Sequence, residues 1–193
     1  MDKGLAAFLV RKTGIDMDLR EYRNSASEKA RLSDLMNLLP EGEFDAVLDV
    51  GARDGFISKL LTDRFSMVTA LDLEQPVIEH ERIRCVKGDI TGLHFADASF
   101  NLVFCAEVLE HIPTHLLETA CQELARVSSN YVLIGVPYKQ DIRVGRTTCG
   151  GCGKANPPWG HVNRFDEDRL SELFPGFTVT NQSFVGETDA QTN

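Results

Sequence analysis

The sequence lacks any apolar run approaching the roughly 18 residues that a membrane-spanning helix requires. Its one short apolar run near the start, residues 4–10, is followed at once by Arg11 and Lys12, with no clear small-residue cleavage site after them. The run therefore does not match a secretory signal. We expect a cytoplasmic protein with no membrane partner.

Runs of basic side chains are also missing. Lys and Arg number 20 against 29 Asp and Glu, which gives a formal net charge of −9. Because an acidic protein repels phosphate backbones at long range, this balance disfavours a nucleic-acid partner and favours small molecules or basic partners. Nothing in the sequence gives the oligomeric state.

The sequence contains few cysteines, and their number is odd. There are five, two of them in one C-x-x-C pattern, which argues against a disulfide framework and favours thiols or metal ligands. With 42% hydrophobic and 25% charged residues, the composition is that of a globular protein. The length of 193 residues fits one domain. We expect a single domain over residues 1–193, in which residues 139–161 form a cysteine-containing loop insertion.

The stretch at residues 46–55, AVLDVGARDG, organises the rest of the chain. Apolar residues lead into Asp49, Gly51 and Gly55 mark a turn, and residues 56–65 continue at helical spacing. Because glycine has no Cβ, a ligand can approach the backbone amides at the start of the helix. The same turn can also serve only to connect a strand to a helix.

The turn lacks the third glycine of the dinucleotide fingerprint G-x-G-x-x-G. It resembles instead the first motif of the class I S-adenosylmethionine-dependent methyltransferases, D/E-x-G-x-G-x-G, with an arginine in place of the middle glycine. This resemblance implies a Rossmann-like α/β fold whose mostly parallel sheet carries helices on both faces, and S-adenosylmethionine as cofactor. The residues that it places at the cofactor are Asp49, Gly51, Ala52, Arg53 and Gly55.

A second strand is expected at residues 67–73. It carries Asp72, which lies 17 residues beyond Gly55. An acidic residue at about this distance can accept hydrogen bonds from both ribose hydroxyls. We therefore expect Asp72, with Leu73 beside it, to hold the cofactor.

Two further motifs follow the same family. The strand expected at residues 83–86 leads to a Gly-Asp-Ile step, and the resemblance implies that Asp89 and Ile90 contact the adenine. Residues 98–113 resemble the fourth strand of the methyltransferase type 11 group, F-D-x-V followed by L-E-H, with asparagine in place of the usual aspartate. There the resemblance implies that Cys105, Ala106 and Glu107 line the sulfonium end.

Apolar spacing predicts the remaining elements. The helices are expected at residues 28–39, capped by Ser25 or Ser27, at 113–127, and after Asp166; the strands are expected at 131–136 and 177–185. No run suits the seventh strand of the family, so either the chain is truncated or the sheet is one strand short. Tyr22 and Arg23 precede a helix that lies over the cofactor in this family, with an exposed polar lead-in as the alternative.

Residues 139–160 form an irregular segment rich in glycine, proline and basic residues. It contains Cys149 and Cys152, and His161 follows. A C-x-x-C-G turn lets two thiolates converge on a tetrahedral ion, so we expect these three residues to bind a metal such as zinc. A redox dithiol and free thiols are the alternatives, and His161 also matches a G-H-x-x-x-F helix entry of the family.

Together these motifs predict S-adenosylmethionine-dependent methyl transfer to a small-molecule acceptor. A general base is needed only for a poorly acidic acceptor, and His111, His161 and Tyr138 are the candidates. The alternatives are a NAD-dependent oxidoreductase and a non-catalytic module that binds an adenosyl cofactor or a metal. The acceptor cannot be read from the sequence, because loops choose substrates independently of the fold.

Overall fold

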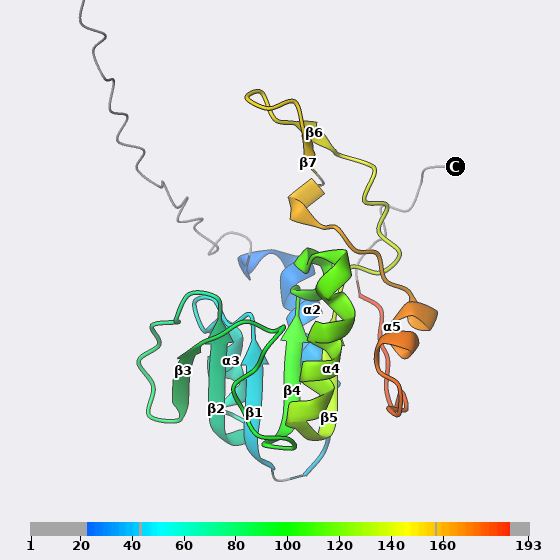
Figure 1. Ribbon diagram of the computed structural model, residues 1–193. Helices are drawn as coiled ribbons and strands as arrows, with labels where there is room; N and C mark the ends of the chain where they lie inside the picture. Colours follow the sequence, from blue (N-terminus) through cyan, green and yellow to red (C-terminus); the bar gives the residue numbers. More distant parts are fainter. Residues whose placement is uncertain (1–22, 43, 157, 186–193) are drawn as a thin grey trace, which may run out of the picture.

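The computed structural model describes residues 23–42, 44–156 and 158–185, and its centre is a five-stranded sheet (Figure 1). The strand order is β3-β2-β1-β4-β5, and every neighbouring pair is parallel. The predicted parallel α/β fold is thereby confirmed. The strands are β1 Phe44–Val50, β2 Phe65–Asp72, β3 Ile83–Lys87, β4 Phe100–Ala106 and β5 Ser128–Gly135.

Helices cover both faces of the sheet. They are α2 Ala26–Asn37 and α3 Phe56–Leu61 on one face, and α4 Leu117–Val127 and α5 Glu167–Leu173 on the other. In Figure 1, α4 lies in front of β4 and β5, and α2 lies behind the sheet. Val47 and Leu48, adjacent on β1, are both fully buried but belong to opposite cores. Burial on both faces explains why this strand reads as a continuous apolar run.

Two helix starts follow the predicted capping. The Ser25 hydroxyl accepts a hydrogen bond from the Glu28 amide at 3.2 Å, and α2 begins there. The Asp166 carboxylate accepts one from the Arg169 amide at 2.9 Å, and α5 begins there. Each cap satisfies an otherwise unpaired backbone N–H and contributes about 1 kcal/mol.

Two helices are shorter than predicted. The helix expected at 56–65 ends at Leu61, because Phe65 already begins β2. The helix expected at 113–127 opens with a 3₁₀ turn, Thr114–Leu116, before α4 starts at Leu117.

The prediction of a strand at residues 177–185 is wrong. This segment is described but forms no strand, and several of its apolar side chains are exposed, Phe184 among them. The segment is held by side-chain contacts, because Phe184 packs against Tyr138 and the Ser183 hydroxyl donates to Asp34 of α2 at 2.6 Å. Within the described residues, β5 has a partner on one side only, as expected for a sheet short of strands.

The cysteine-containing loop carries a small hairpin. Its strands are β6 Thr147–Thr148 and β7 Ala155–Asn156, paired antiparallel, and Figure 1 shows them beyond the carboxyl edge of the main sheet. All five cysteines are free thiols. In the part of the chain that the structure describes, no helix has the length and apolarity to cross a membrane.

Candidate functional site at the carboxyl edge of the sheet

The carboxyl ends of the three central strands are aligned in register. Val50 of β1 pairs with Leu71 of β2 and with Cys105 of β4. The residues that follow these strands therefore meet at one edge, which is where open parallel sheets bind ligands.

The glycine turn between β1 and α3 requires its two glycines. Gly51 has φ +80° and Gly55 has φ +73°, both in the left-handed region. A Cβ on Gly51 would lie 2.4 Å from Cγ2 of Val108, and a Cβ on Gly55 would lie 2.2 Å from Cδ1 of Ile78. Both the backbone conformation and the space therefore select glycine.

Arg53 stands where the resembled motif has its middle glycine, and it adopts the conformation that glycine would favour. Its φ is +49°, which costs a side-chain-bearing residue roughly 1–2 kcal/mol. Its amide donates to Oδ2 of Asp72 at 2.9 Å, while the neighbouring Ala52 is buried and its amide donates to the carbonyl of Leu71. The substitution therefore leaves the path of the turn intact.

Two carboxylates lie at this edge beside the turn. Asp72 is half-buried at the end of β2. It pairs in register with Lys87 of β3, and Asp89 follows Lys87 two residues later, so both carboxylates lie at the same edge of the sheet. Oδ1 of Asp89 accepts hydrogen bonds from the amide and hydroxyl of Thr91 at 2.8 and 2.7 Å, which lower its pKa. Asp89 is exposed and thus ionised near neutral pH.

The apolar residues next to these carboxylates differ in exposure. Leu73, after Asp72, is 64% exposed, whereas Ile90, after Asp89, is buried. A planar ring could therefore rest on the exposed leucine, since its apolar surface has no cover within the described residues.

Asp49 is placed differently from the other motif residues. It is buried, and its Oδ2 accepts a hydrogen bond of 2.5 Å from the Ser58 hydroxyl of α3. Burial raises the pKa of Asp49 to about 7, the Ser58 bond opposes this rise, and Asp72 adds to it. Asp49 therefore fastens α3 beneath the turn, and its carboxylate is directed to the helix.

The end of β4 is buried and apolar. Cys105 is fully buried and Ala106 nearly so, and burial raises the pKa of the Cys105 thiol well above its usual range. Glu107 follows with φ +58°. The chain thus turns sharply where the resemblance places the sulfonium end of the cofactor.

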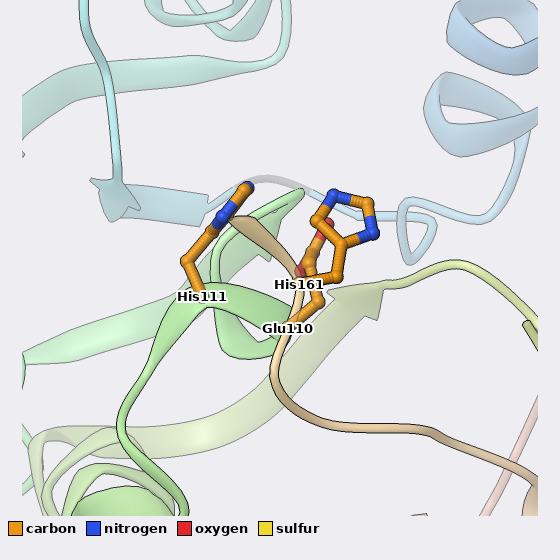
Figure 2. A group of neighbouring side chains, drawn as sticks. All are labelled: Glu110, His111 and His161. Carbon is orange, nitrogen blue, oxygen red and sulfur yellow. The ribbon is translucent and has the colours of Figure 1, made fainter. Parts of the chain in front are cut away.

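After this bend, a cluster forms from Glu110, His111 and His161 (Figure 2). The first two lie on the 3₁₀ turn Leu109–His111, and His161 comes from the segment before α5. Their candidate ligand atoms all lie within 4.8 Å of one another, and the two imidazole rings meet edge to face at 4.7 Å.

Hydrogen bonds hold the two segments of the cluster together. The amide of Val162 donates to the Glu110 carbonyl at 2.8 Å. Nδ2 of the buried Asn163 donates to the carbonyls of Leu109 and Ile112 at 2.9 and 2.6 Å. His161 is thereby fixed beside the turn that carries Glu110.

The cluster combines neutral imidazoles with an isolated carboxyl group. Glu110 has no exposed surface, and its two carboxyl oxygens have no hydrogen-bond partner elsewhere in the described residues. Burial raises the pKa of Glu110 to about 8, Glu107 raises it further, and the charge of Arg31 opposes the rise. Burial also lowers the pKa values of His111 and His161. Such neutral imidazoles can accept protons or bind metal ions.

The predicted set of Cys149, Cys152 and His161 is not brought together. Among the described residues, the one group of three or more side chains that could hold an ion is the Glu110 cluster, and it contains His161 without the cysteines. Cys149 lies in the hairpin, where hydrogen bonds from the backbone of Cys152 and Gly151 lower its pKa. His161 is held away from the hairpin by its contacts to the Glu110 turn, and neither the structure nor the comparisons support zinc at the predicted set.

Two other candidates have structural partners. The Tyr138 hydroxyl donates to Oε1 of Glu167 on α5 at 2.7 Å. Arg23 forms an ion pair with Asp54 in the glycine turn and lies 4.3 Å over the Phe56 ring. Tyr22 lies outside the described residues. Of the three candidate bases, His111 and His161 are in contact with each other, whereas Tyr138 is hydrogen-bonded to α5.

The sequence motifs identified neither Glu110 of the cluster nor Asn163, which holds the cluster's two segments together. Glu110 is part of the L-E-H motif, but that motif assigns it no role, and no motif contains Asn163 as a site residue. A signal did exist, because a glutamate directly after the apolar pair Val108-Leu109 is a charge at a position expected to be buried.

The comparisons with known proteins agree with this architecture. The family model described as a methyltransferase domain matches residues 48–131. A malonyl-[acyl-carrier protein] O-methyltransferase of Enterobacter lignolyticus is 35% identical over 98 residues, which are 48% of this chain and 38% of the relative. A ubiquinone biosynthesis O-methyltransferase of Idiomarina loihiensis is 34% identical over 77 residues, 35% of this chain and 32% of the relative. The chain thus spans only about a third to two fifths of these relatives.

Solved structures show the same fold. The N-methyltransferase NodS of Bradyrhizobium japonicum, in complex with S-adenosylhomocysteine, has a TM-score of 0.58 at 20% identity, over 65% of this chain and 69% of that one. The 1,6-didemethyltoxoflavin N1-methyltransferase of Burkholderia thailandensis has a TM-score of 0.58 at 21% identity, over 80% and 68%. The family model, the relatives and the order of the parallel sheet together support a class I S-adenosylmethionine-dependent methyltransferase.

Proposed function

We propose that this chain binds S-adenosylmethionine at the carboxyl edge of its sheet and transfers the methyl group to a small-molecule acceptor. The observation that carries the proposal is the position of Asp72, a half-buried carboxylate at the end of β2. Its carboxylate accepts a hydrogen bond from the Arg53 amide and therefore lies directly beside the glycine turn. A carboxylate at this place can accept both ribose hydroxyls.

The neighbouring residues supply hydrogen-bonding groups and apolar surface that fit an adenosine. In the proposed mode, Asp89 accepts from the adenine amino group and the Ile90 amide donates to a ring nitrogen. Leu73 offers an exposed apolar side chain beside the ring. Gly51, Ala52 and Gly55 allow the rest of the cofactor to approach the backbone.

The transfer itself makes modest chemical demands on the protein. The bound cofactor supplies a methyl group that is already activated by a positively charged sulfur. In our proposal, Cys105 and Ala106 at the end of β4 border this sulfur, and the neutral thiol adds no competing thiolate there. The chain's task is then to align the acceptor and to exclude water.

A small-molecule acceptor is supported by the acidic net charge of −9. The names of two relatives, for O-methylation of malonyl-[acyl-carrier protein] and in ubiquinone biosynthesis, are compatible with it. For such oxygen acceptors, the neutral rings of His111 and His161 are the candidate proton acceptors at this edge.

A non-catalytic module was the alternative from the sequence, partly because of Arg53. The left-handed backbone of Arg53 weakens that support, since the turn keeps its path. A chain that binds S-adenosylhomocysteine but transfers no tritiated methyl group in an acceptor screen would favour the module over the enzyme.

Calorimetric titration tests the cofactor assignment. We expect the chain to bind S-adenosylhomocysteine in preference to NAD, and Asp72→Asn to weaken this binding at least tenfold, because a charge-assisted hydrogen bond is worth about 1.5–3 kcal/mol. Asp63→Asn is the matched control, since Asp63 is exposed and precedes β2 at the opposite edge. Preference for NAD, or equal loss in both variants, would contradict the proposal.

A further inference from the structure

We propose that Glu110, His111 and His161 bind one divalent transition-metal ion. Their candidate ligand atoms lie within 4.8 Å of one another. Tetrahedral ligands at about 2.0–2.1 Å from one ion are about 3.3–3.4 Å apart, so side-chain rotations must close up to about 1.5 Å. Figure 2 shows the three side chains as close neighbours. Two imidazoles and one carboxylate are the donor set of catalytic zinc sites and of non-haem iron(II) sites.

Glu110 is the residue that points to a cation. It has no exposed surface, and its carboxyl oxygens have no hydrogen-bond partner elsewhere in the described residues. Buried carboxylates are ordinarily paired or bound to a metal, because an isolated one is costly. The charge of Arg31 acts on Glu110, but its hydrogen bonds of 2.7 Å go to Glu28 and its contact of 3.8 Å goes to Glu107. A cation at the cluster would give Glu110 its partner.

Both histidines are oriented as ligands by hydrogen bonds to their rings. Nδ1 of His161 lies 2.6 Å from Oε1 of Gln140. Because an amide oxygen only accepts, this bond assigns the proton to Nδ1 and leaves the lone pair of Nε2 for an ion. His111 makes a hydrogen bond with the backbone of Gly160. Such outer partners are a regular feature of metal-binding histidines.

Three protein ligands leave coordination positions for water or substrate, as in catalytic rather than structural sites. The ion would lie just beyond the bend at Glu107, after the end of β4. There it could bind an acceptor oxygen and lower its pKa, which would replace proton acceptance by the two histidine rings. This last consequence rests on the proposed methyl transfer, whereas ion binding itself can be measured without any cofactor.

The test is a titration with Co²⁺, followed by visible absorption and calorimetry. It uses the full chain with Cys149→Ser and Cys152→Ser, so that thiolates cannot contribute. We expect one equivalent to bind. Glu110→Gln and His161→Asn should each weaken binding at least tenfold, and Gln140→Leu should weaken it about tenfold through loss of the outer partner. His115→Gln is the matched control, since His115 is exposed and outside the cluster.

Thermal unfolding gives a second readout that does not depend on cofactor binding. Without metal, Glu110→Gln should unfold at the same temperature as the parent or higher, because the variant removes an isolated buried carboxyl group. With Co²⁺, only the parent should gain stability. The inference is overturned if the parent binds no equivalent of Co²⁺, or if Glu110→Gln and His161→Asn bind it as the parent does. Failure to bind S-adenosylhomocysteine changes neither outcome.

Discussion

The two halves of the carboxyl edge are built in different ways. The half around the glycine turn, called here the adenosine half, consists of backbone groups and short-range neighbours, such as the Arg53 amide that donates to Asp72. The half around Glu110, called the cluster half, joins segments some fifty residues apart through Asn163, which donates to the Leu109 carbonyl. The first half is therefore fixed by the strand–turn–helix unit, and the second depends on tertiary contacts. Variants that disturb one half should spare the other.

The largest effect is expected at Asp49, which anchors the adenosine half. Its pKa is raised to about 7 by burial, so the folded state binds a proton that the unfolded chain releases near pH 4. This contribution to stability is present below about pH 4 and is lost as the pH rises to about 7, with an upper limit of about 4 kcal/mol. Asp49→Asn should remove this loss in urea unfolding at a series of pH values. An unchanged pH profile would contradict the burial of a proton at Asp49.

The next effect is expected at Gly51. Gly51→Ala combines φ +80° with a Cβ 2.4 Å from Val108, and should lower the free energy of unfolding by about 2–4 kcal/mol. Affinity for S-adenosylhomocysteine should fall at least tenfold. Gly92→Ala is the control, because an added Cβ there meets nothing within 4 Å. Similar losses in both variants would mean that the turn has no special constraint.

A smaller effect in the cluster half separates it from the adenosine half. Asn163→Ala leaves the carbonyls of Leu109 and Ile112 without their partner, which should cost about 2 kcal/mol. Co²⁺ binding should weaken, while affinity for S-adenosylhomocysteine should remain within about twofold. Asn156→Ala, at an exposed position of β7, serves as the control. Equal loss of both ligands in Asn163→Ala would show that the halves are not independent.

The smallest effect is expected at Arg53. Arg53→Gly relieves the strain of φ +49° but increases the entropy of the unfolded chain, so a net gain of about 0.5 kcal/mol is expected. Binding of S-adenosylhomocysteine should be unchanged if Arg53 contributes only its backbone amide. A loss of more than tenfold in calorimetry would instead assign the side chain a contact with the cofactor.

The same contrast explains which features could be predicted from the sequence. The glycine turn, the parallel strands and the caps at Ser25 and Asp166 each depend on residues within one or two elements, and the sequence predicted them. The Glu110 cluster depends on residues more than fifty positions apart, and no local pattern reports such a contact. His161 was therefore assigned to the nearer cysteines.

At residues 177–185 the sequence predicted an element that the structure does not form. Its apolar and β-branched residues favour a strand by composition. A strand, however, needs a neighbouring edge with which to pair, and this segment instead contacts Tyr138 and Asp34 through side chains. Propensity alone could not reveal that tertiary contacts would prevail.

The most direct test of the account is a crystal structure of the chain with S-adenosylhomocysteine. We predict the ribose hydroxyls within hydrogen-bond distance of the Asp72 carboxylate, about 2.6–3.2 Å, and the adenine beside Asp89. An adenosine bound elsewhere, with Asp72 still engaged only by the Arg53 amide, would contradict it.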